Sequence, residues 1–285
     1  MASLRVAILG IGRMGSAAAR RLAGLGYDLI LWNRTREKAE ALAKELGVSV
    51  ARDPADATGR AEAALAFLAD DEALMSVLAL VPRSDGLLFV NMGTHTPRTV
   101  RHARNYVEGR GGCYVEAPVV AGPRVLASGK AIIIYAGRRL CAAQARSILG
   151  DLAEHLIYLG EDPGQAQALK LSYNSLLITT VSSIAQSLRL AEEYGVSKEV
   201  FKELLSKTVF APLAEKYVDR RTRPPEEDAS FTAELAGKDL QYAGTAGYDA
   251  GLPMPITYAA LTLYLSIPAG KRKTDYTRVY HFINK

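Results

Sequence analysis

The chain has 285 residues, 49% apolar and 23% charged, which is the composition of an ordinary globular protein of about two domains. Its net charge of +5 is modest and no five basic residues cluster. A phosphorylated cofactor or a carboxylate ligand explains that charge as well as nucleic acid does, and we expect no nucleic-acid partner. Two cysteines are too few for a disulfide framework, so we expect each to be a small buried hydrophobe. The four histidines lack ligand-like spacing, so we expect no metal site.

Short apolar runs alternate with helical patterns through the first half of the chain, which is typical of parallel βαβ units. The runs predict strands at Leu4–Leu9, Asp28–Trp32, Val48–Val50, Ala63–Leu68, Leu87–Asn91, Cys113–Glu116, Ala131–Tyr135 and Ile157–Leu159. Cys113–Glu116 and Ala131–Tyr135 are expected to be the last strands of one sheet. The intervening patterns predict helices at Met14–Gly24, Arg36–Leu46, Asp71–Leu80 and Arg139–Leu149.

The alternation stops at Gly160–Gly164, and the rest of the chain has helical periodicity almost throughout. Helices are predicted at Gln165–Tyr194, Lys198–Thr208, Pro212–Asp219, Thr232–Gly247 and Pro255–Ser266, with a charged, proline-containing loop at Arg220–Asp228. We therefore predict a doubly wound α/β domain with a mostly parallel sheet over residues 1–162 and an all-helical domain over residues 163–285.

The stretch Leu171–Leu188 carries no charge and raises the question of a membrane span. Half of its positions are Ser, Thr, Asn, Gln or Tyr, which are costly to place in lipid, so a buried helix between domains or subunits fits better and no membrane partner is expected. Met1 leads almost directly into the first predicted strand without a signal peptide, and we expect a cytoplasmic protein.

The turn Gly10-Ile11-Gly12-Arg13-Met14-Gly15 joins the first predicted strand to the first predicted helix. The first glycine allows the sharp bend, the second lets a pyrophosphate approach the backbone, and the third lets helix and strand pack closely. The alternative is a glycine-rich turn without a ligand. Its place at the start of a βαβ unit favours a dinucleotide site of the Rossmann type, with Gly10, Gly12, Arg13, Met14 and Gly15 at the cofactor.

The end of the second predicted strand indicates which dinucleotide is bound. An enzyme that uses NAD usually has Asp or Glu there to hold the ribose hydroxyls, whereas this chain has Asn33-Arg34-Thr35. Arg34 can pair with a 2′-phosphate, and Asn33 and Thr35 can donate hydrogen bonds to it. The alternative is a solvated turn. We predict NADP as the cofactor.

Several motifs in fixed order resemble the β-hydroxyacid dehydrogenases, the family of 3-hydroxyisobutyrate dehydrogenase and of tartronate semialdehyde and glyoxylate reductases. They are the Gly10–Gly15 turn, the segment Asn91–Pro97, the loop Glu116–Gly122, the series Gly164, Lys170 and Asn174, and the pair Phe231 and Lys238-Asp239-Leu240. The resemblance runs nearly end to end. It implies a Rossmann domain followed by an all-helical domain like that of 6-phosphogluconate dehydrogenase, often paired between subunits.

The resemblance also implies site residues. Lys170 resembles the catalytic lysine, and Asn174, one helical turn further on, resembles the amide that orients the substrate. The substrate carboxylate is expected at Val120, Ala121 and Gly122. Further cofactor contacts are expected from Met14, Leu68, Thr96, Phe231 and Lys238, with Phe231 near the nicotinamide.

A lysine suits this chemistry because the hydroxyl proton must leave when hydride leaves the carbon. A solvated lysine is a poor base at neutral pH, but burial next to a positively charged nicotinamide favours its neutral form. Most lysines on helices are solvated charges. Lys170, however, stands at the edge of an uncharged stretch, since the next charged residue on the helix is Arg189.

Departures from the family pattern narrow the substrate. The usual loop reads Asp-Ala-Pro-Val-Ser-Gly-Gly, whereas this chain has Glu116, Val120 and Ala121 at the first, fifth and sixth places, so a hydroxyl donor to the substrate carboxylate is lost. The related 6-phosphogluconate dehydrogenases have a glutamate and a histidine where this chain has Leu177 and Tyr173, which excludes phosphogluconate. Imine reductases of this fold usually replace the lysine, so its retention favours a hydroxyl/carbonyl pair.

Among family members the chain most resembles NADP-dependent L-serine 3-dehydrogenases, and L-serine is the expected substrate. 3-Hydroxyisobutyrate, threonine and glycerate remain open, as does a glyoxylate or semialdehyde reductase acting in the opposite direction. An alternative of another class is a non-catalytic NADP-binding protein, against which Lys170 and Asn174 argue together. The uncharged Leu171–Leu188 helix predicts a homodimer or homotetramer formed through the helical domain.

Overall fold

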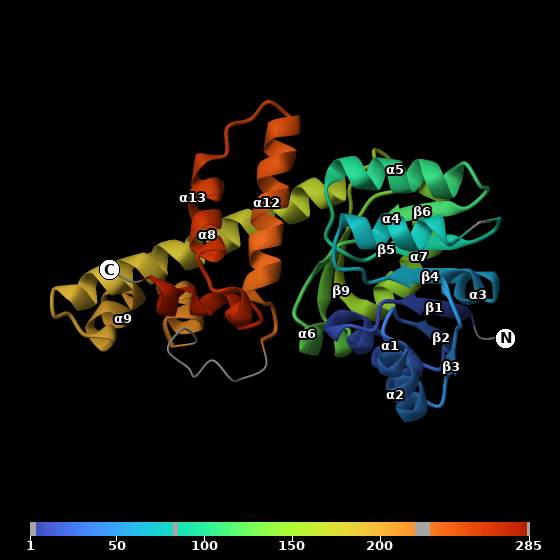
Figure 1. Ribbon diagram of the computed structural model, residues 1–285, viewed down its shortest axis with the longest axis horizontal. Helices are drawn as coiled ribbons and strands as arrows, with labels where there is room; N and C mark the ends of the chain where they lie inside the picture. Colours follow the sequence, from blue (N-terminus) through green and yellow to red (C-terminus); the bar gives the residue numbers. More distant parts are fainter. Residues whose placement is uncertain (1–3, 82–84, 220–228, 284–285) are drawn as a thin grey trace. The chain divides into compact units, whose positions relative to one another are not determined.

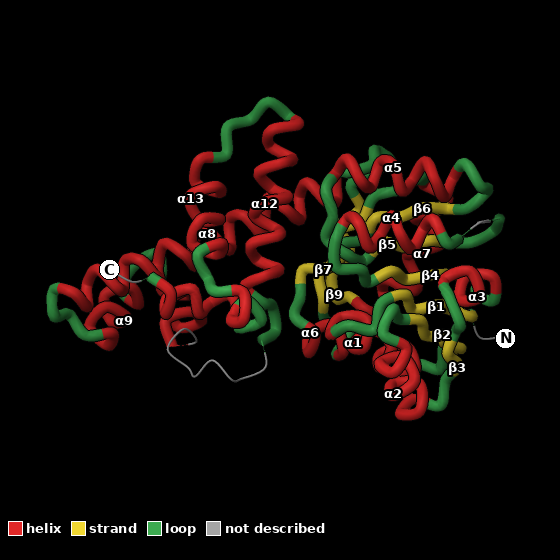
Figure 2. The backbone as a smooth tube through the Cα atoms, in the orientation of Figure 1, coloured by secondary structure: helices red, strands yellow, loops and turns green. Residues whose placement is uncertain are grey.

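The computed structural model describes residues 4–81, 85–219 and 229–283, and its chain divides into two compact units, residues 1–170 and 171–285 (Figure 1). Strands lie in the first unit, and the described part of the second unit is helical (Figure 2). The predicted change from α/β to helical structure is thereby confirmed. The division at residue 162 stays a prediction, since the compact units meet inside a helix at Lys170 and Leu171.

The first unit contains a parallel sheet whose six described strands follow the order β3-β2-β1-β4-β5-β6. This is the doubly wound order of a Rossmann domain, with the switch point between β1 and β4. The strands are β1 (Arg5–Leu9), β2 (Asp28–Trp32), β3 (Ser49–Val50), β4 (Ala63–Ala66), β5 (Leu88–Asn91) and β6 (Cys113–Glu116). The helices are α1 (Arg13–Gly24), α2 (Arg36–Leu46), α3 (Pro54–Gly59), α4 (Asp71–Ala79), α5 (Pro97–Glu108), α6 (Pro123–Ala127) and α7 (Arg139–Leu152).

Both faces of this sheet are covered, which explains why its strands are nearly continuous apolar runs. Val6 and Ile8 of β1 belong to one buried cluster, which includes α1 and α7, and Ala7 and Leu9 belong to another, which includes α4 and α5. The carboxyl ends of β1, β2, β4, β5 and β6 therefore meet at one edge of the sheet. Loops from that edge carry the predicted cofactor and substrate residues.

The prediction that Ala131–Tyr135 ends the main sheet is wrong. This strand, β8, is the middle of a second sheet, in which β7 (Val119–Val120) pairs with it antiparallel and β9 (Ala153–Tyr158) pairs with it parallel. An apolar run indicates a buried strand but not its partner. Here the short hairpin through α6 brings β8 back alongside β7, so β8 pairs with β7 instead of extending the main sheet beyond β6.

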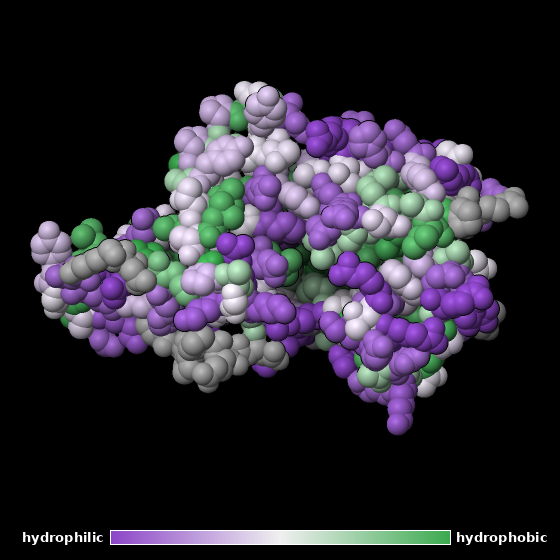
Figure 3. Space-filling view, in the orientation of Figure 1, coloured by the Kyte–Doolittle hydropathy of each residue, from purple (hydrophilic) through white to green (hydrophobic). Residues whose placement is uncertain are grey.

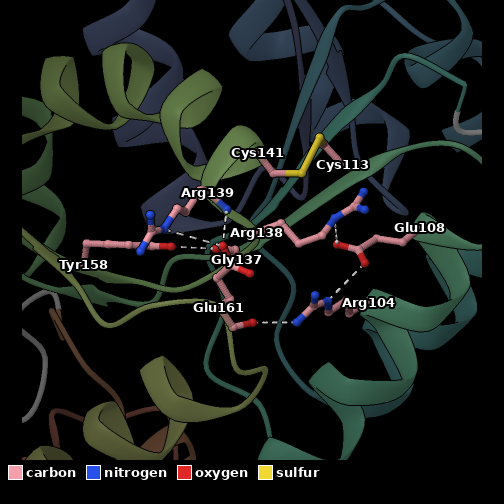
Figure 4. The surroundings of a disulfide bond; sticks show 9 residues. All are labelled: Arg104, Glu108, Cys113, Gly137, Arg138, Arg139, Cys141, Tyr158 and Glu161. Atoms are coloured by element: carbon pink, nitrogen blue, oxygen red, sulfur yellow. Dashed lines mark hydrogen bonds and ion pairs between the residues drawn. A yellow bond between two sulfur atoms is a disulfide. The ribbon is translucent and has the colours of Figure 1, made fainter.

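The prediction of two free cysteines is also wrong. Cys113, the first residue of β6, and Cys141, in the first turn of α7, form a disulfide with Cα atoms 5.3 Å apart (Figure 4). The residues are 28 apart in the chain, and α7 packs on the sheet beside β6. Nearby, the Glu108 carboxylate forms ion pairs with Arg104 at 3.1 Å and with Arg138 at 3.3 Å (Figure 4).

The second unit packs helices around a core that includes Ile178, Val181, Leu240, Leu261 and Tyr264. Its elements are α8 (Gln165–Glu193), which begins in the first unit, then α9 (Lys198–Ser206), α10 (Ala211–Leu213), a π-helical turn (Ala214–Val218), α12 (Ala233–Asp249), α13 (Pro255–Leu265) and two 3₁₀ turns (Ala269–Lys271 and Tyr276–Phe282). The predicted loop Arg220–Asp228 lies outside the described residues. None of the described helices has the length and hydropathy that a membrane span requires.

Candidate active site

The glycine turn between β1 and α1 has the backbone geometry of a dinucleotide cradle. Gly10 has φ +98°, and a Cβ there would lie 2.4 Å from the carbonyl oxygen of Phe67. A Cβ on Gly15 would lie 1.9 Å from the carbonyl oxygen of Gly10, so only glycine allows this close packing. A Cβ on Gly12 would meet nothing within 4 Å, and Gly12 is the N-cap of α1 without a side-chain cap.

These features fit a pyrophosphate. The first turn of α1 contains no acidic residue, and the open space is at Gly12, where a phosphate would meet backbone N–H groups and the positive end of the helix. Arg13 is exposed at this turn. Met14 is half-buried against the core, and Leu68 would lie 3.4 Å from a Cβ on Gly10, so both line the rim of the turn.

The segment that follows β2 joins this cradle directly. The side-chain oxygen of Asn33 accepts a hydrogen bond from the Ile11 N–H at 2.9 Å, and its amide donates to the Thr35 carbonyl at 2.8 Å. Asn33 therefore holds the glycine turn against the end of β2, a role that the sequence did not indicate. Arg34 and Thr35 are exposed. The contacts of all three residues with a 2′-phosphate stay a prediction.

Thr96 is the N-cap of α5, and its hydroxyl belongs to a small polar cluster. It donates to Asp71 at 2.6 Å, accepts from the Thr99 N–H, and lies 3.0 Å from the Thr99 hydroxyl. The Thr96 N–H also donates to Asp71, at 3.0 Å. Asp71, at the start of α4, thus fixes the loop after β5 at the carboxyl edge of the sheet.

The start of α8 is anchored to the ends of β5 and β6, which are neighbours in register at Asn91 and Glu116. The Glu116 carboxylate accepts hydrogen bonds from the N–H groups of Gly164 at 2.6 Å and Gln167 at 3.1 Å. The Gln167 side chain accepts from the His95 N–H and donates to the Gly93 carbonyl, both at 3.0 Å.

A buried polar network continues from this anchor toward β5. The Asn91 amide nitrogen lies 3.1 Å from both His95 Nδ1 and the Tyr114 hydroxyl, and the Asn91 side-chain oxygen accepts from the Gly93 N–H. Burial is the main cause that raises the pKa of Tyr114 well above its usual value. The network makes the loop after β5 a fixed support for the first turn of α8.

Lys170 lies in the second turn of α8 and is 7% exposed. The predicted substrate loop is in the same unit. Val120 ends β7, Gly122 is the N-cap of α6, and these two residues and Ala121 are half-buried. The Gly122 carbonyl accepts from Val125 and Leu126 N–H groups in α6.

In the helical unit, two of the predicted residues, Asn174 and Lys238, meet at the carboxylate of Asp239. The Asn174 amide donates to Asp239 at 2.5 Å, and Lys238 lies 3.1 Å from the other Asp239 oxygen and 4.8 Å from the Tyr242 ring. Asn174 and Asp239 are both buried. Phe231 contacts Tyr276 edge-on, with ring centres 5.2 Å apart.

Sequence reasoning passed over three residues of these clusters. The motif Lys238-Asp239-Leu240 gives Asp239 no role of its own, Glu116 stands out only as a departure in the substrate loop, and none of the motifs names Gln167. A carboxylate beside a motif lysine was the available signal for Asp239. Glu116 and Gln167 meet partners about 50 to 75 residues away in the chain, which no local pattern reveals. Among the described residues, no group of three His, Cys, Asp or Glu could hold a metal ion.

Comparison with known proteins shows that two family models match this chain. Residues 5–160 match the model of the NAD-binding domain of 6-phosphogluconate dehydrogenase, and residues 164–283 match the NAD-binding domain of NADP-dependent 3-hydroxyisobutyrate dehydrogenase. The chain belongs to the β-hydroxyacid dehydrogenase family. As a member, it is an oxidoreductase that uses a nicotinamide cofactor and acts on CH–OH groups. The predicted family and fold are confirmed.

Relatives of this β-hydroxyacid dehydrogenase differ in their named activities. The chain is 29% identical to the uncharacterized oxidoreductase YfjR of Bacillus subtilis, covering 90% of this chain and 91% of the relative. It is 26% identical to glyoxylate/succinic semialdehyde reductase 1 of Arabidopsis thaliana, covering 90% of each. It is also 26% identical to the cytokine-like nuclear factor N-PAC of Danio rerio, covering 97% of this chain but 61% of that protein.

Solved structures agree on the fold. A structure of Mycobacterium tuberculosis 3-hydroxyisobutyrate dehydrogenase with L-serine has a TM-score of 0.85 at 24% identity, covering 99% of this chain and 100% of that one. A reductive aminase from Aspergillus terreus with NADPH has a TM-score of 0.66, also at 24% identity, covering 99% of this chain and all of the other. At this identity the likeness establishes the fold alone.

Proposed function

We propose that this protein oxidises the hydroxyl of a small 3-hydroxy acid, with L-serine as the first candidate, and uses NADP as hydride acceptor and Lys170 as general acid and base. The observation that carries the proposal is the placement of Lys170. It is buried in the second turn of α8, whose first turn is anchored to the carboxyl edge of the sheet that bears the glycine cradle. We propose residues 1–162 as the NADP-binding domain and 163–285 as the substrate and oligomerisation domain.

Each of the proposed site residues has its own role in the reaction. When bound, the oxidised nicotinamide accepts hydride from the carbinol carbon. Lys170 takes the hydroxyl proton at Nζ in oxidation and returns it in reduction. Asn174 donates its amide to Asp239, which leaves its side-chain oxygen to orient the substrate hydroxyl.

The substrate acid group is proposed to bind the loop of Val120, Ala121 and Gly122. Val120 has no hydroxyl, so this loop offers backbone N–H groups where the family's usual serine would add a side-chain donor. Binding would therefore depend more on the shape of the loop than in relatives with serine. Phe231 and Lys238 of the helical unit, with Thr96, are proposed to complete the cofactor site.

A second candidate is a reductase of glyoxylate or a semialdehyde. The relative from Arabidopsis with that name covers 90% of this chain, and the same proton group serves both directions. 3-Hydroxyisobutyrate is a third substrate to test, because the second family model is that of its dehydrogenase. The alternative of another class is a protein that binds NADP without turnover, and one relative, from Danio rerio, is named as a cytokine-like nuclear factor instead of an oxidoreductase.

The function is tested by a substrate panel with NADP and NAD, in both directions, that follows the absorbance of reduced nicotinamide. We expect oxidation of L-serine to have the highest kcat/KM of the panel, above that of 3-hydroxyisobutyrate, threonine and glycerate. Higher efficiency in the reduction of glyoxylate or a semialdehyde would select the second candidate. Tight cofactor binding without turnover of any compound would select the non-catalytic alternative.

Lys170→Met deletes the proton group and keeps most of the side chain's length. We expect kcat to fall by ~10²–10⁴-fold with little change in cofactor affinity, because the proton moves in the transition state. Lys44→Met, on the exposed side of α2, is the matched control and should leave kcat unchanged. Lys238→Met should act more on binding than on kcat. A Lys170→Met enzyme with a tenth or more of wild-type kcat, when chemistry limits the rate, would remove Lys170 from the mechanism.

We also propose a homodimer or homotetramer formed through the helical unit. Large apolar side chains are exposed there, among them Leu176 at 68%, Val209 at 88% and Ile256 at 71%, and hydrophobic residues are visible on the surface of the molecule (Figure 3). Exposed large apolar side chains are typical of interaction surfaces, and symmetric pairing with a second copy is the commonest way to cover them. Light scattering at micromolar concentration should give at least a dimer mass, and a monomer would refute the proposal.

A further inference from the structure

The end of β6 carries a carboxylate in an unusual environment. Glu116 is 1% exposed, and both of its oxygens accept hydrogen bonds from backbone N–H groups at the start of α8, those of Gly164 and Gln167. Burial is the largest influence on its ionisation and raises the pKa to about 7. The backbone N–H groups of Gly164, Gln167 and Ala166, and the charge of Arg101, partly oppose that rise.

A charge is an expensive way to cap a helix. Neutral Ser, Thr or Asn side chains satisfy the same N–H groups without the cost of removing a carboxylate from water. In this chain Ser197 and Thr232 cap α9 and α12 in that neutral manner, and the carboxylates that cap α3 and α4, Asp53 and Asp70, are only half-buried. A carboxylate as buried as Glu116 at the start of a long helix therefore raises the question of a requirement beyond holding the helix end.

The contacts around Glu116 fix the first turn of α8 tightly. Gln167 forms the second anchor, through Gly93 and His95, in the loop after β5. Gly164 has φ +96°, and a Cβ there would lie 2.9 Å from the Cβ of Pro97, so the approach to the helix is closely packed as well. Two strand ends thus set the rotation and height of this turn.

Lys170 is three residues beyond Gln167, on the next turn of the same helix. A helix is stiff over one turn, so a shift or rotation of the anchored turn moves the lysine with it. Misplacement of a reacting group by about 1 Å can cost ~10²-fold in rate. The anchor is therefore close enough to control the geometry of proton transfer.

We propose that the ionised carboxylate of Glu116 is a positioning residue, which holds the start of α8 so that Lys170 is placed for proton transfer. Glu116 does not exchange a proton with the substrate in this scheme. The inference rests on the function proposed above, because it concerns the placement of the lysine in that reaction.

The groups that face Glu116 determine how this device depends on pH. They are the N–H groups of α8, Arg101 of α5 and the neutral Tyr114 of its own strand. When Glu116 is protonated, its O–H faces N–H donors and the attraction to the helix end is lost. Placement of Lys170 should therefore deteriorate as the pH falls below about 7.

When the reaction is measured in the reduction direction, Lys170 and Glu116 are expected to affect the rate at opposite ends of the pH range. Lys170 must be protonated to deliver a proton, so its titration lowers the rate at high pH, whereas loss of the Glu116 charge lowers the rate at low pH. The contribution of Glu116 to the free energy of unfolding changes with pH in the opposite sense to its expected effect on the rate. The pKa of folded Glu116 is about 7, above its ordinary 4.5, so its stabilising contribution is present below 4.5 and lost as pH rises through 7. The enzyme should gain activity in the range where this group costs stability.

The test compares Glu116→Gln, Glu116→Asp and the control Glu108→Gln, in reduction from pH 5.5 to 9, with chemistry rate-limiting. Glu108 is also a carboxylate of the first unit, paired with Arg104 and Arg138 (Figure 4). We expect Glu116→Gln to lower kcat by about 10–100-fold, to leave the cofactor KM within about twofold, and to abolish the acid limb near pH 7. Glu116→Asp, which keeps the charge, should recover most of kcat and retain an acid limb, and Glu108→Gln should behave as wild type.

Two further measurements distinguish a loss of positioning from a loss of folding. Thermal unfolding without substrate should show that wild type loses stability relative to Glu116→Gln between pH 5 and 8. Should Glu116→Gln not fold, Gln167→Met tests the same anchor and should lower kcat about 10-fold while the acid limb persists. An unchanged kcat or acid limb in Glu116→Gln, or wild-type kcat in Gln167→Met, overturns the inference. If Lys170→Met is meanwhile inactive, the proposed function stands. A tenth or more of wild-type kcat in Lys170→Met removes Lys170 from the mechanism and this inference with it, and absence of turnover of any compound in the substrate panel refutes the proposed function itself.

Discussion

The glycine cradle of the sheet unit and the Asn174 pair of the helical unit are held together in different ways. At the cradle, backbone packs on backbone, and the Asn33 side chain binds the Ile11 N–H of the turn. In the helical unit, side chains meet side chains across helices, as Asn174 meets Asp239 and Ser175 meets Thr257 at 2.8 Å. Helix backbones have already used their own N–H and C=O groups, so side-chain pairs are what remains.

This difference explains where substitutions should be felt. A cradle made of backbone depends on space, and it fails when an atom is added. A pair of buried side chains depends on satisfaction of both members, and it fails when one member is removed. Each kind of loss is measurable, so experiments can show whether the two regions respond differently to substitution.

The largest effect is expected from an added methyl group in the cradle. Gly15→Ala would place a Cβ 1.9 Å from the Gly10 carbonyl oxygen, a backbone atom that cannot move aside. We expect a loss of at least about 3 kcal/mol in the free energy of unfolding by denaturant titration, the upper end for overpacking. Gly12→Ala, whose Cβ would meet nothing within 4 Å, should leave stability within about 0.5 kcal/mol and weaken cofactor binding instead. Equal stability of the two variants would contradict the cradle.

Next in size is the loss of one partner in the helical unit. Asp239→Ala leaves the buried Asn174 amide without its acceptor, and we expect a loss of about 1–3 kcal/mol in the free energy of unfolding. Asn174→Ala in the same background should cost less than it does in wild type, because the two residues act as a pair. Additive losses in this double-mutant cycle would show that the pair does not stabilise the unit.

The smallest expected effect concerns cofactor choice at the exposed end of β2. We expect NADP to exceed NAD by at least tenfold in kcat/KM, about 1.4 kcal/mol, and Arg34→Asp to abolish that preference. Arg36→Asp is the control, because Arg36 is exposed close by and pairs with Glu40 on its own helix. Equal use of both cofactors by the wild-type protein would refute the NADP assignment.

Much of the sheet unit could be predicted because its signals are local. The ranges predicted for α2, β2, β6 and β8 match the structure residue for residue, and the glycine turn lies where its spacing placed it. Helix α5 was missed, although Thr96-Pro97 is a good start signal and Val100, Ala103 and Val107 form its buried face. Its many basic and polar residues hid that narrow stripe.

Features that depend on distant parts of the chain could not be predicted. The pairing of β8 with β7 and β9, the disulfide, and the anchor formed by Glu116 and Gln167 all join residues whose separation no local period encodes. For the site, the family resemblance supplied Lys170 and Asn174, but the partner that holds the Asn174 amide became visible only when α8 and α12 were packed.

The link between Cys113 and Cys141 has a practical consequence for every one of these measurements. It lies at the first residue of β6, while Glu116 is the last residue of that strand, about 10 Å further along. In a reducing compartment such as the cytosol the same pair would be two thiols, so one preparation can contain two covalent forms that differ by two hydrogens. Intact mass, with and without reductant, therefore belongs beside each unfolding curve, since variants are comparable only in the same thiol state.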